Sequence, residues 1–310
     1  MLNFGQHVAR LCGAAVVALS LASAASAADI TIKHAQGETA VPASPAKVIV
    51  LDLATLDNLD RLGVKVSGVP TLVTAPDFLK KYQSDDYPKV GTLFEPDYEA
   101  INAAEPDLII VGGRSAAKYP ELAKIAPTID LTVSSKDLIG GTEANVEKLG
   151  QIFGKQAEAK AEIEKLNADV ATLKQKAADK GTGLLILTTG GKMSAYGPGS
   201  RFGMLHDAYG VTPAAKDLTT KGNHGQPISQ EFILKTNPDW LFVIDRDAAI
   251  GREGNSAKQI LDNDLVRQTT AAKKDQIVYL KSQNWYLVGG GLNGLHGTID
   301  QLSEVFDKAK

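Results

Sequence analysis

The sequence predicts an α/β protein of two Rossmann-like lobes with mostly parallel sheets, joined by one long bridging helix. Residues 156–178 contain neither Gly nor Pro and consist almost entirely of strong helix formers. Apolar side chains recur there at intervals of three and four residues, which places one apolar stripe on a helix of about 35 Å. A surface helix within a single domain is the alternative. The flanking segments favour the bridge, because they repeat each other.

One sequence pattern occurs twice, at a constant offset of 132 residues. Each copy reads Glu, six residues, Pro-Asp, an apolar run and then Arg. The marked positions are Glu99, Pro106, Asp107 and Arg114 in the first copy, and Glu231, Pro238, Asp239 and Arg246 in the second. Four consecutive apolar residues are typical of a parallel strand that is buried on both faces. Two copies that flank one long helix predict two similar lobes.

The first lobe is predicted from strand and helix patterns in alternation. An edge strand is expected at 30–34, a buried strand at 47–52, and a helix at 53–62 that Gly63 ends. The further elements are a short strand after residue 68, a polar loop or helix at 75–87, the first repeat copy at 97–114, a helix at 115–125, a strand at 127–132 and a helix at 143–153.

The second lobe repeats this alternation. A strand at 183–188 opens it, a Gly-rich loop follows, and residues 285–288 are strand-like. The further elements are a helix at 201–209, a polar loop at 219–227, the second repeat copy at 229–246, a short helix at 256–261, a strand at 276–280 and a terminal helix at 292–309. Strands that alternate with helices predict mostly parallel sheets.

The first 27 residues have the pattern of a secretory signal peptide. Arg10 precedes an apolar run that is too short to span a bilayer, and small residues end at Ala27. The predicted divisions are a signal peptide at 1–27, an N-terminal lobe at 28–154, the bridging helix at 155–180 and a C-terminal lobe at 181–310. Cys12, the only cysteine, lies in the signal, so the mature chain is expected to lack disulfides. We expect a periplasmic protein that is not inserted in the membrane.

Charge and motifs argue against several function classes. The formal net charge of −3 argues against a nucleic-acid partner. The sequence contains no G-x-S-x-G elbow, Walker loop or H-E-x-x-H. Residues 289–294 fit G-x-G-x-x-G, but the 16 residues that follow are too few for a dinucleotide-binding unit. These observations favour a binding protein over an enzyme; an exported α/β hydrolase is the rival from another class.

Candidate binding side chains stand where the predicted strands stop. Arg114 and Arg246 end the two repeat copies, and Arg201 ends a third loop, after the strand that opens the second lobe. His224 and Tyr286 occupy loops of the same kind. Ligands of open α/β sheets bind outside the carboxyl ends of the strands. Each residue alone is more often a surface residue, so the prediction of one shared cleft rests on their joint placement.

The chain resembles the periplasmic siderophore-binding proteins of iron ABC importers. The resemblance rests on the signal pattern, the bridging helix, the paired E-x6-P-D strands, and the N-H-G-Q and N-W-Y-L-x-G-G-G segments, and it covers essentially the whole mature chain. The likeness is greatest to the subfamily that captures ferric catecholates of the enterobactin and petrobactin type. Carriers of haem, cobalamin or hydroxamate siderophores share the overall plan and stay as alternatives.

The resemblance implies a role for each candidate residue. The matched positions are Arg114, Arg201, Arg246 and Trp285 for the siderophore, His224 and Tyr286 for its iron, and Glu99 and Glu231 for docking on the permease. The implied ligand is an Fe(III)-catecholate siderophore complex, with no permanently bound cofactor. The implied partner is an inner-membrane ABC permease, and the protein itself is expected to be a monomer. Each glutamate taken alone is better explained as the start of a helix, near the positive end of the helix dipole.

The chemistry of the ligand agrees with three arginines. A ferric catecholate carries net negative charge, and a guanidinium offers a planar fork of donors to its oxygens. Three arginines in one cleft of a net-acidic protein would neutralise and orient such a complex. A haem or cobalamin carrier would not need all three.

Overall fold

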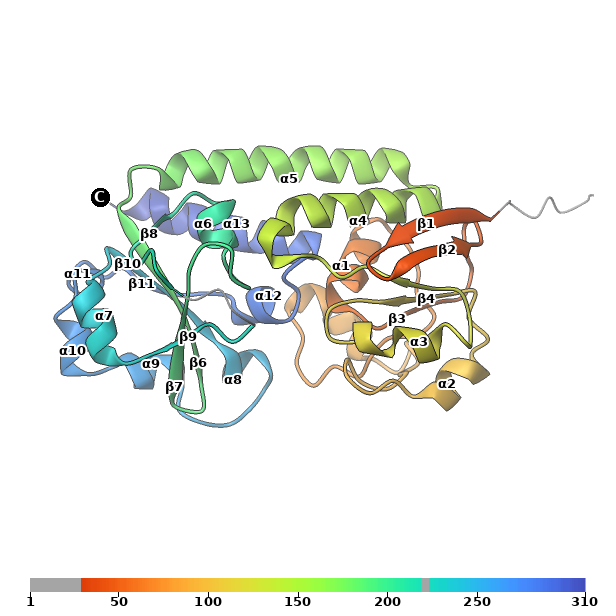
Figure 1. The fold of residues 1–310 in the computed structure, drawn as a ribbon, viewed down its shortest axis with the longest axis horizontal. Helices are drawn as coiled ribbons and strands as arrows, with labels where there is room; N and C mark the ends of the chain where they lie inside the picture. The colour runs from red at the N-terminus through yellow and green to blue at the C-terminus, as the bar shows by residue number, and fades with distance from the viewer. Residues whose placement is uncertain (1–28, 219–222, 310) are drawn as a thin grey trace, which may run out of the picture.

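A computed structural model describes residues 29–218 and 223–309, which form two lobes side by side along one long helix (Figure 1). The predicted signal peptide, 1–27, and residues 219–222 of the predicted polar loop lie outside the described residues. Within the part that is described, no helix combines the length and the apolar character needed to cross a membrane.

The N-terminal lobe is built on a small parallel sheet. Its strands are β3 (Val48–Val50), β4 (Leu108–Val111) and β5 (Thr128–Asp130), in that order across the sheet. Every residue of these strands is buried, as the unbroken apolar runs of β3 and β4 predict for those two strands. The predicted edge strand is β1 (Ile30–His34), which forms an antiparallel hairpin with β2 (Gly37–Val41) beside β5.

The sheet of the C-terminal lobe is larger and mixed, with the order β11-β10-β6-β7-β9 and with β8 paired to β6. Its strands are β6 (Thr182–Thr189), β7 (Lys192–Tyr196), β8 (Thr212–Pro213), β9 (Gln226–Ile228), β10 (Trp240–Asp245) and β11 (Ile277–Tyr279). β6 pairs in parallel with β10 and β8, and β10 with β11, whereas β7 runs antiparallel to β6 and β9. The predicted α/β class with mostly parallel sheets is confirmed, and β7 is the antiparallel strand of this sheet. The predicted Gly-rich loop after β6 is a hairpin, because Gly190 and Gly191 have positive φ angles and turn the chain into β7.

The other elements are helices and short 3-10 segments. They are α1 (Leu53–Arg61), η1 (Asp77–Gln83), α2 (Tyr98–Ala103), η2 (Ala116–Lys118), α3 (Tyr119–Leu122), η3 (Ser135–Asp137), α4 (Leu138–Phe153), α5 (Gln156–Ala177), α6 (Met204–Asp207), α7 (Gln230–Thr236), α8 (Arg246–Ala249), α9 (Ala257–Leu261), α10 (Asp264–Arg267), α11 (Thr270–Lys273), α12 (Ser282–Tyr286) and α13 (Leu292–Lys308). The helices predicted at 115–125 and 201–209 are shorter than expected: the first range holds η2 and α3, and the second holds α6. The run at 285–288 is not a strand, since α12 contains its first two residues.

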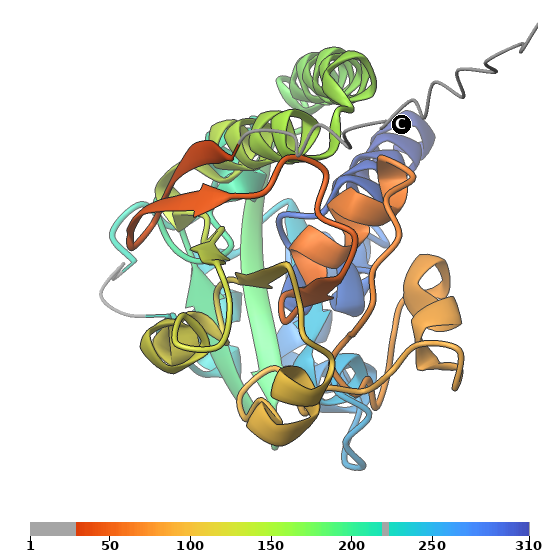
Figure 2. The same ribbon diagram turned by 90° about the vertical axis from the view of Figure 1, so that its right-hand side faces the viewer.

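The predicted bridge is α5. It packs against α4 of the N-terminal lobe and against α13 of the C-terminal lobe, and Figure 1 shows it running along both. Viewed along its length, α5 lies on the same edge of the molecule as α4 and α13 (Figure 2). Gly150 of α4 permits the close approach, because a Cβ there would lie 2.8 Å from the Cβ of Ala159. The limits predicted for the two lobes, 28–154 and 181–310, stay predictions.

A second contact joins the lobes where α13 begins. The carboxylate of Asp57, on α1 of the N-terminal lobe, accepts hydrogen bonds from Gly294 N at 3.0 Å and Asn293 Nδ2 at 2.7 Å. A Cβ on Gly291 would collide with this carboxylate. The Gly-rich segment at 289–294 is therefore the place where α1 approaches the start of α13, as expected of glycines that admit another part of the chain.

Candidate functional site

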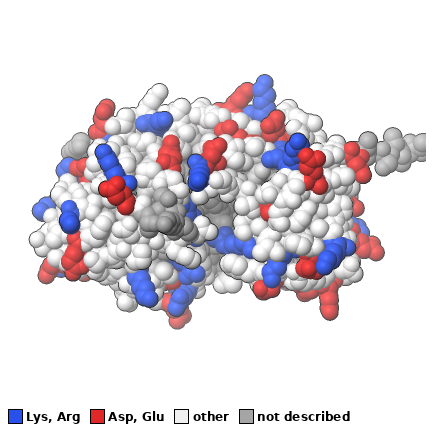
Figure 3. Space-filling view, in the orientation of Figure 1, with Lys and Arg blue, Asp and Glu red and all other residues white. Residues whose placement is uncertain are grey.

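A cavity of about 590 Å³ lies between the two lobes. The loops after β4 and β5 supply its wall in the N-terminal lobe, and the turn after β7 together with α12 supplies the opposite wall. Figure 3 shows a hollow between the lobes in which Lys or Arg atoms are exposed. Of the predicted site residues, Arg114, Arg201, His224, Trp285 and Tyr286 line the cavity.

Arg114 extends from the N-terminal lobe across the cleft. The loop that carries it is fixed by Ser115, whose buried hydroxyl donates to the Leu51 carbonyl at 2.9 Å and accepts from Gly112 N at 3.1 Å. The guanidinium donates from Nη2 to the backbone carbonyl of Tyr286 at 2.5 Å. Arg114 therefore lies where β4 stops, as predicted, and connects the two lobes.

Arg201 reaches the same carbonyl from within the C-terminal lobe. Its Nη2 lies 3.4 Å from the Tyr286 carbonyl oxygen, and its Cζ lies 4.8 Å from the ring centroid of Phe202. The predicted route to this position is wrong. Arg201 follows β7, which runs back from the end of β6 towards its start and whose last residue, Tyr196, pairs with Leu185 in the middle of β6. It therefore approaches from the other end of the sheet rather than from the carboxyl end of β6.

Arg246 holds the side chain of Tyr286. As the first residue of α8 it follows β10 directly, and its Nε donates to the phenolic oxygen of Tyr286 at 2.7 Å. Its Nη1 donates to Thr189 Oγ1 at 3.2 Å. Arg246 itself is not among the residues that line the cavity. The Cζ atoms of Arg114, Arg201 and Arg246 lie 5.3, 4.6 and 5.4 Å from the ring centroid of Tyr286. The three arginines thus converge on one tyrosine.

The electrostatics of this cluster favour negative charge. Burial alone would raise the pKa of the Tyr286 phenol, but the hydrogen bond from Arg246 and the charges of all three arginines outweigh it and lower that pKa. Burial, and then the charge of Arg201, lowers the pKa of Arg114. Guanidinium groups that repel one another are stabilised by any anion placed among them. The cluster is therefore suited to a phenolate or to an anionic ligand.

The remaining predicted cavity residues differ in exposure. His224 is exposed at the rim, whereas the side chain of Trp285 is only 2% exposed. The Trp285 indole packs edge-on against Tyr209, with ring centroids 6.3 Å apart, and its Nε1 has no hydrogen-bond partner. His224 and Tyr286 border the same cavity. Iron ligation by these two side chains stays a prediction.

The two glutamates predicted to dock on a permease lie outside the cavity. Glu99 and Glu231 are exposed in the first turns of α2 and α7, one in each lobe and both away from α5 (Figure 1). The cap of α2 is already supplied by Asp97, which accepts from Ala100 N at 3.0 Å. Glu99 is therefore not needed to cap its helix, and docking by this pair stays a prediction.

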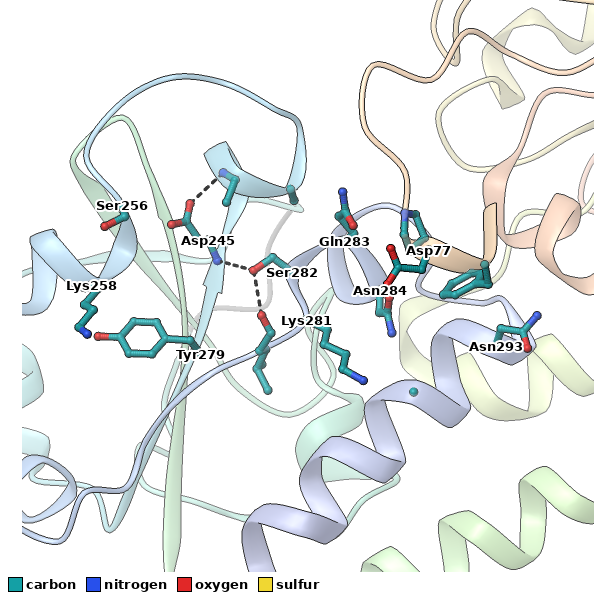
Figure 4. A pocket seen from close by; sticks show the side chains of 16 residues that line it. Asp77, Asp245, Ser256, Lys258, Tyr279, Lys281, Ser282, Gln283, Asn284 and Asn293 are labelled. Atoms are coloured by element: carbon teal, nitrogen blue, oxygen red, sulfur yellow. Dashed lines mark hydrogen bonds between the residues drawn. The ribbon is translucent and has the colours of Figure 1, made fainter. Parts of the chain in front are cut away.

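A second cavity, of about 610 Å³, also lies between the lobes but shares no lining residue with the first. Figure 4 shows Asp77 of the N-terminal lobe facing Gln283 and Asn284 of α12 across it. Its lining contains Lys258 and Lys281 but no arginine. The arginine cluster therefore distinguishes the first cavity as the candidate site.

Two lobes, a bridging helix and a cleft lined from both sides define a substrate-binding protein. The chain belongs to the periplasmic binding protein family, whose model matches residues 48–284.

Individual relatives share most of their length with this chain. It is 42% identical to the petrobactin-binding protein YclQ of Bacillus subtilis over 90% of this chain and 89% of that protein. It is 33% identical to the ferric-anguibactin-binding protein FatB of Vibrio anguillarum, over 88% and 86%. Among solved structures, the catecholate-siderophore binding protein VctP of Vibrio cholerae superposes with a TM-score of 0.84 at 33% identity, over 89% of this chain and 99% of that one.

Several lining residues were not predicted from the sequence. They include Asp52, Phe94, Phe202 and Met204. Asp52 is the N-cap of α1, where its carboxylate accepts from the backbone and side chain of Thr55, and burial raises its pKa. A cap residue at the end of β3 was a usable signal for a position at the cleft. Phe94 carried none, because an isolated aromatic in a polar turn has no recognisable period.

Proposed function

We propose that this protein captures a ferric catecholate siderophore in the cleft between its lobes and delivers it to an inner-membrane ABC permease. The observation that carries the proposal is the convergence of three guanidinium groups on Tyr286 at the wall of the cavity. A ferric catecholate is anionic and presents oxygens to such donors. The cavity volume of about 590 Å³ is within the range of small-molecule sites.

The relatives support the class of ligand. Their names describe binders of petrobactin, ferric anguibactin and a catecholate siderophore. Because these proteins share 33–42% of their residues with this chain over most of its length, the same class of ligand is the simplest assignment here. A haem, cobalamin or hydroxamate carrier of the same fold is the alternative. None of those ligands requires the arginine cluster for charge neutralisation.

Protein side chains would complete the coordination sphere of the ferric iron only for siderophores that leave some of its positions open. A hexadentate siderophore fills all six positions of ferric iron, whereas a tetradentate one leaves two open. We assign those two positions to His224 and Tyr286. The lowered pKa of Tyr286 favours the phenolate, which is a hard oxygen donor suited to ferric iron. Imidazole is a common metal ligand, and His224 is exposed at the rim of the cavity.

Delivery requires a contact with the permease. Glu99 and Glu231 are exposed on separate lobes and would present two matched negative charges to arginines of the permease. Reversing both charges to Arg should abolish uptake while siderophore affinity stays unchanged. A matched control reverses Glu121, an exposed glutamate of α3 outside the repeat pattern. Normal uptake by the double variant would contradict a docking role and would leave the two glutamates as ordinary residues in the first turns of their helices.

The remaining parts of the proposal concern the form of the protein. We propose a monomer without catalytic activity, exported to the periplasm and cleaved after residue 27. N-terminal sequencing of the exported protein tests the cleavage position. An exported hydrolase is the competing function, and turnover of ester or phosphate substrates by the pure protein would support it.

The direct test is gel filtration of the pure protein mixed with a ferric catecholate. We expect the iron complex to co-elute with the protein as one coloured ligand per monomer. The Arg114→Ala/Arg201→Ala/Arg246→Ala triple variant should elute colourless while it keeps the same elution volume. Elution of wild-type protein without colour would contradict the proposed function.

A further inference from the structure

Phe94 is an exposed aromatic residue on the wall of the ligand cavity. Its side chain is 59% exposed, and within 29–218 and 223–309 only Val73 and Tyr279 are comparably exposed large apolar residues. Single exposed apolar side chains are common on protein surfaces. Phe94 differs because it lines the cavity that carries the arginine cluster, whereas Val73 lines neither cavity and Tyr279 lines the other one.

The turn that carries Phe94 is held in one conformation by its own hydrogen bonds. Thr92 Oγ1 accepts from Phe94 N at 3.2 Å and from Glu95 N at 3.0 Å, while Thr92 N donates to the Glu95 carbonyl at 2.8 Å. Gly91 enters the turn with φ of +95°, and a Cβ there would collide with the backbone of Asp97. The aromatic ring is therefore carried by a turn whose backbone conformation is restrained by hydrogen bonds.

The same turn is connected to the loop of Arg114. Glu95 Oε2 pairs with Lys118 Nζ at 2.8 Å, four residues after Arg114. An exposed ion pair of this kind contributes little stability. It shows that the turn and the loop of Arg114 lie next to each other. Phe94 and Arg114 thus belong to one wall of the cavity, supplied by neighbouring loops of the N-terminal lobe.

The cavity is also lined by apolar side chains. Besides Phe94, they include Leu131, Val133, Leu138, Phe202 and Met204. An anionic metal complex surrounded by aromatic rings matches a cavity whose lining combines cationic donors with apolar side chains. A ring on a preorganised turn binds at a lower entropic cost than one that must be ordered first.

We propose that Phe94 is a ligand-contacting residue that packs against the aromatic rings of the bound siderophore and so favours aryl over aliphatic ferric complexes. This inference rests on the proposed function. It concerns the aromatic rings of the siderophore, whereas the arginines are proposed to bind its anionic oxygens. Offset or edge-on packing of two aromatic rings adds to the apolar area that is buried. Because Phe94 is already exposed in the free protein, its truncation leaves the folded core intact.

The test compares two ferric ligands in four proteins. The proteins are the wild type, Phe94→Ala, Phe94→Leu and the control Val73→Ala, and the ligands are a ferric catecholate and ferric citrate, which has no aromatic ring. We expect Phe94→Ala to weaken the catecholate about tenfold, which is the order of one aromatic contact plus its buried area. Phe94→Leu should weaken it less, and citrate binding should not change in any variant.

The outcomes separate this inference from the proposed function. Unchanged catecholate affinity in Phe94→Ala, with a wild type that binds normally, would overturn the inference alone. A wild type that binds no catecholate would overturn both. Unchanged affinity together with reduced uptake would assign Phe94 to the permease surface, which also contradicts the inference. A fifth protein, Thr92→Val, lacks the hydroxyl that holds the turn, so it should bind the catecholate more weakly although it keeps the Phe94 ring.

Discussion

Arg246 Nε donates a hydrogen bond to the phenolic oxygen of Tyr286 at 2.7 Å. The same phenol ring has two further guanidinium groups over it, so its oxygen lies in a strongly positive environment. Arg246 contacts Tyr286 and does not line the cavity, whereas Arg114 and Arg201 are at the cavity wall. We therefore expect Arg246 to influence a bound ligand through Tyr286. This division of roles separates the three arginines that the sequence presents as equivalent.

The first prediction concerns the titration of Tyr286. Its pKa is lowered because the hydrogen bond from Arg246 and the three positive charges outweigh burial. Removing the donor in Arg246→Ala should raise that pKa, so this phenolate should form at higher pH than in the wild type. Ultraviolet difference titration measures the change, with Tyr286→Phe identifying the signal. An unchanged titration in Arg246→Ala would contradict the role given to this hydrogen bond.

The second prediction treats the arginines as a set. Replacing Arg114 or Arg201 by Ala should weaken a ferric catecholate by about 1.5–3 kcal/mol, the range for hydrogen bonds to charged groups. Replacing Arg246, which does not line the cavity, should weaken it less, through the change at Tyr286. Arg→Lys should recover only part of the loss, because the ammonium keeps the charge but lacks the fork. Isothermal titration calorimetry measures each variant. Equal weakening of neutral ligands would indicate misfolding rather than loss of charge recognition.

The third prediction distinguishes ligation of iron from simple anion binding. His224→Ala and Tyr286→Phe should weaken a bis-catecholate iron complex and shift its visible charge-transfer band, because we propose that these side chains fill the two iron positions that such a siderophore leaves open. A tris-catecholate complex should respond much less. Visible titrations of both complexes with each variant decide the question. Identical spectra in all proteins would leave only the arginine cluster as the binding determinant.

The fourth prediction concerns the second contact between the lobes. Burial raises the pKa of Asp57 to about 7, although hydrogen bonds from Gly294 and Asn293 oppose this. The native state therefore holds a proton that the unfolded chain releases near pH 4, so stability should be highest at acidic pH and fall as pH rises through 7. Urea unfolding between about pH 5 and pH 8 tests this. The control is Asp57→Asn, whose side chain cannot titrate. If the free energy of unfolding changes with pH in the same way in both proteins, the prediction is contradicted.

The same contact bears on how far the lobes move. Asn58 Oδ1 accepts from Leu292 N at 2.9 Å, next to the bonds of Asp57, and α5 spans both lobes. Two connections, rather than the bridging helix alone, therefore restrain the lobes. We expect rotations of only a few degrees on binding, so the radius of gyration should barely change in small-angle scattering.

Local pattern was sufficient for much of the fold. The bridging helix at α5 and the strands β4 and β10 follow from composition, periodicity and the repeated Pro-Asp signal. β7 was missed although Gly190-Gly191 is a recognisable hairpin turn. The run at 285–288 was assigned to a strand because four apolar residues do not distinguish a strand from a buried helix.

The site was predicted by residue type more than by geometry. Arg114 and Arg246 lie where their strands end, as predicted, because each follows a parallel strand, but only Arg114 of these two lines the cavity. The position of Arg201 depended on the unpredicted β7. The contact of Asp57 between the lobes could not be predicted from the sequence. Its partners Asn293 and Gly294 are more than 230 residues away, and no periodic pattern links them to it.

The most direct test of the central claim is fluorescence quenching across a panel of ligands. Trp285 adjoins Tyr286 at the cavity wall, whereas Trp240 packs against Phe242 and Phe306 in the core, so a ligand in the cleft should quench Trp285 selectively. We expect tight, saturable quenching by ferric catecholates, and little by ferric hydroxamates, haem or cobalamin. Tighter binding of haem, cobalamin or a hydroxamate than of every ferric catecholate would contradict the account.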